Sequence, residues 1–274
     1  MIIIGEKING FIPKTLAAIE TQDAEYIRQL AKAQTKAGAN YLDICAGTSQ
    51  ELEQQTLEWL IGLVQESCDT PLCLDSSDPQ LLLDMRGLVQ RAGLLNSVSM
   101  ETVDDGRTKC DVVFPVIAES KWGVVALTCD QNGIPDDPEI KLEIARKMID
   151  QAAETGIAPE RIFIDPLVTT LATKQDSLAN FTEAIHLIHA EYPTVHFTSG
   201  LSNISFGMPF RRAINTQFLA LAMAAGMDSA IMDPTSPSMQ ATLHATNALL
   251  GKDEYCMDYL QAYRDGMFEA TPRT

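Results

Sequence analysis

Short apolar runs alternate with amphipathic helical stretches along the whole chain, and this alternation limits the possible folds more than any other feature. The runs are continuous, as in parallel strands that are covered on both faces. They lie at residues 2–4, 42–44, 72–75, 94–98, 123–127, 161–165, 196–198 and 229–233. The stretches between them are long enough for the crossovers that parallel pairing requires. Eight such units in 274 residues predict one α/β domain, folded as a (β/α)8 TIM barrel.

Helices are expected between these runs, and local signals mark several of their ends. They are placed at 15–37, 51–66, from 79 onward, 104–119, 138–154, 176–190, 210–225 and 238–250. Gly38 follows the first as a terminating glycine, and Asp78 and Pro79 form a cap and first helical position. A doubly wound open sheet is the alternative, but no G-x-G-x-x-G motif follows the first run. We expect 1–250 to form the barrel and 251–274 a segment packed on it or at a dimer interface.

The charge balance argues against two classes of partner. The chain has 20 basic and 37 acidic residues, for a net charge of −17. A surface this acidic repels nucleic-acid phosphates and anionic lipid headgroups. The chain has no apolar run of membrane-spanning length and no basic-then-apolar leader. We therefore expect a cytoplasmic protein that binds neither nucleic acid nor membrane.

Cysteine and histidine spacing gives no indication of a metal site. The six cysteines include no C-x-x-C pair, so neither a zinc knuckle nor a dithiol redox motif is present. His186 and His189 are three residues apart on an expected helix and could share a metal. Because no cysteine or carboxylate cluster accompanies them, a helix-surface position is favoured and no metal is predicted.

Polar side chains follow almost every predicted strand. They are Glu6, Asn9, Asp43, Asp75, Asn96, Thr128, Asp130, Asp165, Ser202, Asn203 and Asp233. Any one of them has an ordinary explanation as a helix cap or turn residue. In a barrel, however, the carboxyl ends of all strands meet at one mouth, where active sites form. Their convergence predicts a ligand-lined mouth.

The residue types at these ends indicate what they could bind. Carboxylates and carboxamides suit a ligand that offers several N–H donors along a planar edge, because a carboxylate accepts two parallel bonds. The only basic residues available are Lys7, Lys174, Arg211 and Arg212. The last run ends in Met232-Asp233-Pro234, without the glycine-rich phosphate loop of phosphate-binding barrels. A phosphate-rich substrate is therefore not expected.

Seven segments carry a resemblance to a known family. They are 5–10 (GEKING), 74–76 (LDS), 96–97 (NS), 133–135 (GIP), 164–167 (IDPL), 200–205 (GLSNIS) and 214–215 (IN). Each is weak alone, but together they cover nearly the whole chain in the family's order. The chain resembles the pterin-binding methyltransferases, which move a methyl group between methyltetrahydrofolate and a corrinoid protein.

The resemblance implies a pterin lying across the barrel mouth. Asp75, Asn96 and Asp165 match the residues that hydrogen-bond the polar edge of the pterin. Asn203 matches the asparagine that reaches the pterin N5 atom, so Asn203 and Asp165 are the catalytic candidates. The full predicted substrate-binding set is Glu6, Asn9, Asp75, Asn96, Asp165, Ser202, Asn203 and Arg211.

Further expectations follow from the same resemblance. A methyl group on the tertiary amine N5 is a poor electrophile until that nitrogen gains positive character, and Co(I) corrin is the strong nucleophile that accepts it. No histidine here lies in the Asp-x-His-x-x-Gly setting of corrinoid-binding domains, so the corrinoid is expected on a separate protein. The family implies a homodimer with a role in one-carbon metabolism, including anaerobic demethylation. Phe206 stands where a relative has a polar amide, so this loop is expected to shape the pocket differently.

Three other interpretations remain open at this level. Dihydropteroate synthase uses a similar barrel and pterin pocket, but it needs basic residues near strands seven and eight. The runs at 196–198 and 232–234 supply no Arg-x-His and no Lys. A non-catalytic folate-binding subunit is a second alternative. The third is an unrelated barrel whose strand-end acids are only caps.

Overall fold

The computed structural model describes residues 1–269 and has eight parallel strands in the order β7-β6-β5-β4-β3-β2-β1-β8. The strands are β1 (Ile2–Asn9), β2 (Tyr41–Cys45), β3 (Leu72–Asp75), β4 (Leu94–Met100), β5 (Gly123–Asp130), β6 (Ile162–Asp165), β7 (His196–Phe197) and β8 (Ser229–Met232). The outer strands β7 and β8 lie close to each other: the amide of Ile231 in β8 donates to the carbonyl of Ser199, two residues after β7, at 2.9 Å. The sheet is therefore almost closed, and the predicted (β/α)8 barrel is confirmed.

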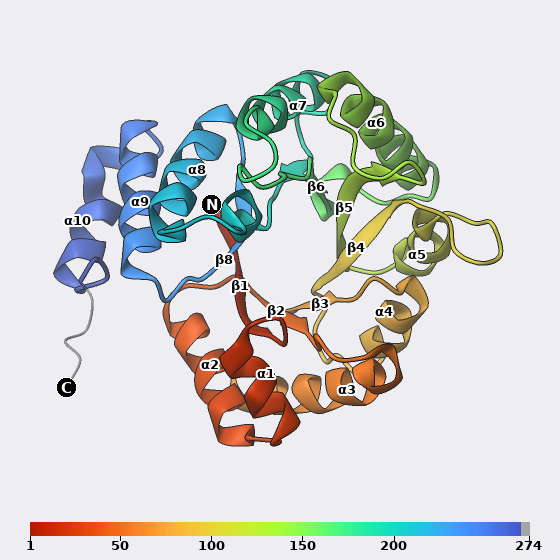
Figure 1. Ribbon diagram of the computed structural model, residues 1–274, viewed down its shortest axis with the longest axis horizontal. Coiled ribbons are helices and arrows are strands. Elements are labelled where there is room, and N and C mark those ends of the chain that lie inside the picture. The colour runs from red at the N-terminus through yellow and green to blue at the C-terminus, as the bar shows by residue number, and fades with distance from the viewer. Residues whose placement is uncertain (270–274) are drawn as a thin grey trace.

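Helices form a ring outside the strands (Figure 1). They are α1 (Pro13–Glu20), α2 (Ala24–Lys36), α3 (Gln50–Ser67), α4 (Pro79–Arg86), α5 (Lys109–Ile117), α6 (Pro138–Glu154), α7 (Ser177–Glu191), α8 (Arg211–Ala225), α9 (Pro237–Leu249) and α10 (Met257–Arg264). Three short 3-10 turns are η1 (Pro159–Arg161), η2 (Leu201–Ser205) and η3 (Glu254–Cys256). The last helix, α10, lies outside the ring against α9.

Two predicted helices differ from those observed. The predicted helix 15–37 is interrupted, because Gln22 has a φ of 52° and Asp23 starts α2 by accepting a bond from the Tyr26 amide at 3.1 Å. The predicted helix 104–119 begins later, at Lys109. There Thr108 and Asp111 form a reciprocal capping box, with the Thr108 amide donating to Asp111 Oδ2 at 2.7 Å. The first break involves neither proline nor glycine, so the sequence gives no signal for it. The second was signalled by Gly106, which has a φ of 84° in the turn before Thr108.

Two apolar layers stabilise the barrel. A large core lies between the strands and the helices. A small core fills the inside of the barrel and consists of Ile4, Cys73, Leu94, Val125 and Phe163. This inner core closes the barrel below its mouth, so that only the strand ends are open to a ligand.

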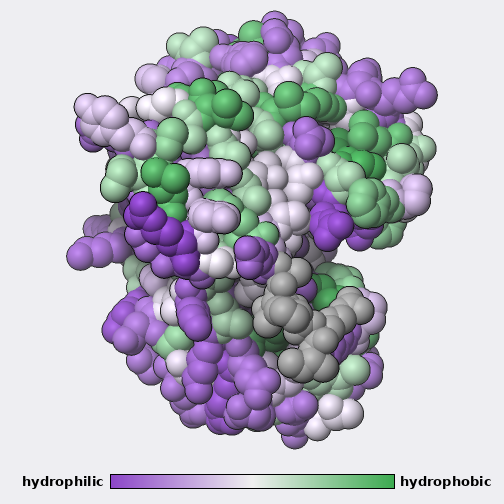
Figure 2. All heavy atoms as spheres, turned by 90° about the vertical axis from the view of Figure 1, so that its left-hand side faces the viewer, coloured by the Kyte–Doolittle hydropathy of each residue, from purple (hydrophilic) through white to green (hydrophobic). Residues whose placement is uncertain are grey.

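The side of the molecule that carries α9 and α10 has a mixed surface. Hydrophilic residues cover much of its lower half, whereas hydrophobic residues gather in separate groups above (Figure 2). Leu249, Tyr255 and Tyr263 are exposed on these helices and the turn between them. Of the segment predicted at 251–274, the last five residues lie outside the described part of the chain.

Residues 1–269 contain no helix that is both long and apolar enough to cross a bilayer. Within the same range, no group of three or more His, Cys, Asp or Glu side chains is placed to hold a metal ion. His186 lies 3.9 Å from Glu183 on the exposed face of α7. All six cysteines are free thiols.

Two glycines test the tightness of the barrel. A Cβ at Gly93, just before β4, would lie 1.9 Å from the backbone oxygen of Leu72, whereas one at Gly62 in α3 meets nothing within 4 Å. We expect Gly93→Ala to lower the free energy of unfolding by about 1–3 kcal/mol, the usual cost of overpacking. Gly62→Ala should raise it by up to about 1 kcal/mol through helix propensity. Urea unfolding measures both, and equal effects would contradict this packing.

Candidate active site

The mouth is polar because of strand geometry. Side chains alternate between the two faces of a strand, so the second residue beyond an inner-core residue also points into the barrel. In β1, β3, β4 and β6 that second residue is polar. The four residues are Glu6, Asp75, Asn96 and Asp165. The structure therefore gathers these four predicted residues above the inner core.

One side of the mouth is a buried group on β2, β3 and β4. Asp75 pairs with Asn96 in register across β3 and β4, and the Asn96 amide donates to Asp43 Oδ1 at 3.3 Å. Burial raises the pKa of Asp75 to about 6, although a hydrogen bond from the Cys45 thiol opposes this rise. Burial, followed by the charge of Asp75, holds the pKa of Asp43 well above its usual range.

Asp43 was noted at a strand end but was not included in the predicted binding set. Its inward position could have been found from the alternation in β2, because Tyr41 two residues earlier packs against the inner core. Asp43 is 1% exposed and lies behind Asn96. It therefore orients the Asn96 amide from within the barrel.

On the other side of the mouth, Asp165 at the end of β6 is tied to two loops. Its Oδ1 atom accepts a bond from the Leu167 amide at 2.8 Å, and the Gly200 amide also donates to this carboxylate. Burial raises the pKa of Asp165 to about 6, while these two bonds and the charge of Lys141 lower it. Asp165 thus fixes the position where the chain leaves β7, immediately before the turn that carries Asn203.

That turn, η2, is stabilised by a side chain from α8. The Arg211 guanidinium donates to the Ser202 carbonyl at 2.6 Å and to Ser205 Oγ at 3.0 Å. Its Cζ atom lies 6.0 Å from the ring centroid of Phe206, which is 69% exposed. Three residues of the predicted binding set, Ser202, Asn203 and Arg211, are therefore neighbours, and Asn203 is exposed at the rim. Phe206 lies outside the buried part of the mouth.

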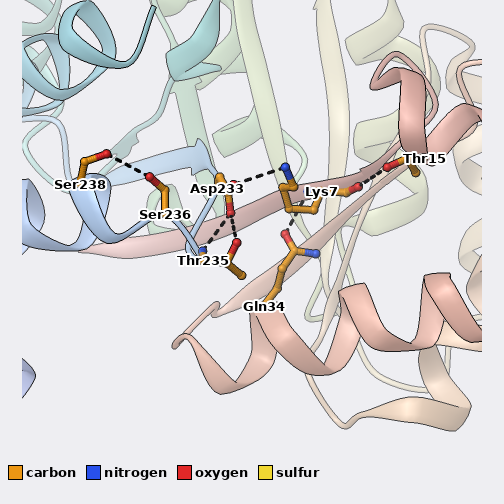
Figure 3. Close-up of polar contacts among 7 residues, drawn as sticks. All are labelled: Lys7, Thr15, Gln34, Asp233, Thr235, Ser236 and Ser238. Atoms are coloured by element: carbon orange, nitrogen blue, oxygen red, sulfur yellow. Dashed lines mark hydrogen bonds and ion pairs between the residues drawn. The ribbon is translucent and has the colours of Figure 1, made fainter. Parts of the chain in front are cut away.

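The β1 and β8 ends close the ring of polar residues. Lys7 Nζ lies 3.3 Å from Asp233 Oδ2, and Asp233 also accepts a bond from the Thr235 amide at 2.9 Å (Figure 3). The Lys7 amide donates to Gln34 Oε1 at 2.9 Å, so this backbone is held from α2 as well. Asn9 lies further along β1, where its side chain accepts a bond from the Phe11 amide at 2.8 Å.

Glu6 is the most perturbed carboxyl group that faces this side. Burial and the nearby charge of Asp233 raise its pKa to about 7, while Lys7 and Arg211 oppose the rise. It lies beside a pocket of about 310 Å³ between β1, β8 and α8, which Arg211 and Asp233 also line. Near neutral pH this carboxyl can therefore either donate or accept a proton.

Large apolar side chains surround the mouth. They lie in loops that follow strand ends and are exposed: Phe11 after β1, Ile134 after β5, and Phe206 and Phe210 after β7. Exposed apolar groups around a polar opening are typical of a surface that another molecule covers.

Comparisons with known proteins agree on one family. The family described as "Pterin binding enzyme" matches residues 14–233. A methylcorrinoid:tetrahydrofolate methyltransferase from Eubacterium limosum is 48% identical over 268 residues, which are 97% of this chain and 97% of that protein. Methionine synthase from Mycobacterium tuberculosis is 33% identical over 242 residues, 85% of this chain but only 20% of the larger protein.

Solved structures with a similar fold include dihydropteroate synthases. The enzyme from Xanthomonas albilineans in complex with 7,8-dihydropteroate has a TM-score of 0.61 at 19% identity, covering 91% of this chain and 92% of that chain. The Coxiella burnetii enzyme in complex with pteroic acid has a TM-score of 0.63 at 15% identity, covering 90% and 93%. At these identities the likeness concerns the fold alone.

The raised pKa of Glu6 predicts a pH-dependent stability. Because folding raises the pKa of Glu6 from 4.5 to about 7, the folded protein holds this proton more tightly than the unfolded chain does. The free energy of unfolding that the protonated carboxyl contributes is therefore lost as the pH rises through 7. Glutamine does not titrate, so Glu6→Gln does not lose stability in this pH range through this side chain. We expect the stability of Glu6→Gln relative to the unsubstituted protein to increase between about pH 6 and about pH 8.5.

Urea unfolding at several pH values measures this difference. Glu20→Gln is the matched control, because Glu20 is exposed at the end of α1. A stability difference for Glu6→Gln that stays constant with pH would contradict the environment described for Glu6.

Proposed function

Because the chain belongs to the pterin-binding enzyme family, we propose that it is a methyltransferase of the EC 2.1.1 type acting on folate. It moves a methyl group between N5 of tetrahydrofolate and the cobalt of a corrinoid on a separate protein. The main support for this proposal is the methylcorrinoid:tetrahydrofolate methyltransferase that is 48% identical over 97% of both chains. The acidic mouth and the absence of a corrinoid-binding histidine motif in the sequence support it.

The proposed pterin site uses the buried groups of the mouth. A pterin presents ring N–H and amino groups along one planar edge, and a carboxylate accepts two such parallel bonds. Asp165 is assigned to the ring N–H and the amino group, with Asp75 and Asn96 on the same edge. These groups are preorganised, because Asn96 is bonded to Asp43 and Asp165 to the Leu167 amide. The ring would rest on the inner core below.

Asn203 is assigned to the chemistry at N5. The methyl group departs only when N5 can keep the electron pair of the breaking bond, and protonation of N5 makes this possible. The acceptor contributes the electron pair of the new carbon–cobalt bond, and N5 becomes the N–H of tetrahydrofolate. The Asn203 side-chain oxygen accepts a hydrogen bond from N5–H as positive charge develops there. The remaining predicted contacts, Glu6, Asn9, Ser202 and Arg211, surround the ring.

Dihydropteroate synthase activity is disfavoured by the ends of strands seven and eight. His196 starts β7, and its Nδ1 atom lies 2.7 Å from Asp228, which precedes β8. This histidine is therefore at the end of the barrel opposite the mouth. At the mouth Asp233, rather than a basic residue, follows β8.

Assembly and location are further parts of the proposal. The exposed apolar side chains around the mouth fit docking of the corrinoid protein over the pterin. We propose a cytoplasmic homodimer active in anaerobic demethylation, with 1–250 as the catalytic barrel. Residues 251–274 would pack on the barrel or form the dimer interface, and exposed Leu249, Tyr255 and Tyr263 support the interface.

A methyl-transfer assay tests the function directly. Purified protein is incubated with methyltetrahydrofolate and Co(I) cobalamin, and the reverse reaction uses methylcobalamin with tetrahydrofolate. We expect transfer only when a corrinoid is supplied, and a purified protein without colour. Folate binding without transfer in either direction would favour a non-catalytic subunit, while release of pyrophosphate from a pterin pyrophosphate would favour a synthase. Corrin recovered in stoichiometric amount would contradict a separate carrier.

Asn203→Ala tests the assigned chemistry. We expect methyl transfer to fall by about 10²-fold or more, the usual effect of removing one preorganised polar group. The dissociation constant for tetrahydrofolate should change much less, because the pterin edge is held elsewhere. Asn247→Ala, near the C-terminal end of α9 and therefore at the end of the barrel opposite the mouth, is the control. A normal transfer rate in Asn203→Ala would rule out this role.

A further inference from the structure

Lys141 is a buried lysine outside the proposed set of pterin contacts. It lies near the N-terminal end of α6 and is 3% exposed. Both circumstances are unfavourable for a lysine, because burial removes water from the ammonium group and the N-terminal end of a helix carries partial positive charge. Burial accordingly lowers the pKa of Lys141. A lysine at such a position has to be stabilised by the groups around it, and these groups connect it to the mouth of the barrel.

The ammonium group of Lys141 is attached to the loop that follows β6. Its Nζ atom donates to the Leu167 carbonyl at 2.9 Å, which is its one hydrogen bond within the described part of the chain. The charges of Asp165 and Asp136 favour the ammonium form of Lys141, whereas the charge of Lys174 opposes it. Asp136 is already in an ion pair with Lys174. Asp165 is therefore the carboxylate that the charge of Lys141 is left to stabilise.

Leu167 stands between Lys141 and Asp165. Its amide donates to Asp165 Oδ1 at 2.8 Å, while its carbonyl accepts the bond from Lys141. Leu167 has a φ of 57°, a left-handed conformation that is rare for leucine and requires support from the surrounding structure. Lys141 and Asp165 supply this support at the two ends of the same residue. The lysine therefore fixes the loop position from which the Leu167 amide reaches the carboxylate.

Asp165 needs a positive charge nearby because of the groups it is assigned to bind. A carboxylate accepts two parallel N–H bonds only when it is ionised, whereas a protonated carboxyl presents a donor of its own. Burial favours the protonated form and raises the pKa of Asp165 to about 6, and Lys141 is the charged side chain that opposes this rise. Without that charge, less of the ionised form would be present near neutral pH.

We propose that Lys141 is a positioning residue for pterin binding: its ammonium group keeps Asp165 ionised and, through Leu167, holds it in the orientation that accepts the pterin N–H groups. Lys141 acts through Asp165 and does not itself touch the pterin, since it belongs to α6 in the outer ring of helices (Figure 1). This inference rests on the proposed function and deepens it, because it adds a residue outside the strand ends to the groups that recognise the pterin.

Lys141→Met tests this role, because it removes the charge and keeps a side chain of similar length. Isothermal titration calorimetry measures the dissociation constant for 5-methyltetrahydrofolate at about pH 6 and about pH 8.5. At about pH 6 Asp165 is largely protonated in the variant, so we expect binding about five- to tenfold weaker than in the unsubstituted protein. At about pH 8.5 Asp165 is ionised in both proteins, and the two constants should agree within about threefold. Their ratio cancels any titration of the ligand itself.

Lys147→Met is the matched control, because it removes the same charge from an exposed position on the same helix. It should leave folate binding unchanged at both pH values. Lys141→Gln is a second neutral variant, which retains an N–H donor for the Leu167 carbonyl and should show the same dependence on pH as Lys141→Met. A loss of affinity that is equal at the two pH values, or no loss at all, would overturn the role of Lys141.

A second measurement requires no folate. NMR titration of labelled aspartate carboxyl carbons gives the pKa of Asp165, whose signal is assigned by its absence in Asp165→Asn. We expect this pKa to rise above about 6 in Lys141→Met and Lys141→Gln. An unchanged pKa in a protein that binds folate would overturn the role of Lys141 alone. If the unsubstituted protein does not bind 5-methyltetrahydrofolate, the proposed function fails, and the role of Lys141 in pterin binding fails with it.

Discussion

Closure of eight parallel strands around a small apolar core is the constraint on which the site depends. Once Ile4, Cys73, Leu94 and Phe163 fill the inside of the barrel, side-chain alternation places the second residue after each of them in the mouth. Those positions are enclosed by neighbouring strands and lose most of their water. A carboxyl group there has a raised pKa before any ligand arrives, as Asp165 does at about 6.

The cost of burying these acids is offset by bonds that also position them. Asp165 accepts from the Leu167 and Gly200 amides, so the same contacts that lower its pKa join β6 to the β7–α8 loop. Asn96 is held by Asp43 in a comparable way. A ligand with several N–H groups would add hydrogen bonds to carboxylates that are already oriented, and little conformational entropy would be lost on binding.

The sequence allowed the fold and most of the mouth to be predicted, because both depend on local patterns. Apolar runs locate the strands, and the polar residue that ends a run, such as Asp75 or Asp165, locates the mouth. Contacts between distant segments carry no such signal. The bond from Arg211 to the Ser202 carbonyl depends on how α8 returns over η2, and the role of Asp43 depends on its register with β3. The break after α1 was missed for a different reason, because Gln22 adopts a positive φ that glycine usually marks.

The residues assigned to pterin binding lie deep in the mouth, whereas the residue assigned to the chemistry lies at its rim. Asp165 and Asn96 are 4% and 8% exposed, whereas Asn203 lies exposed on the rim and is carried by a turn that Arg211 braces. In the proposed function, the pterin edge is therefore held inside while N5 faces outward. A corrin ring is far too large to enter a barrel whose interior is filled by side chains. It can reach the methyl group only from outside, which explains why the reactive atom has to lie at the rim and why exposed Phe11 and Phe210 surround it.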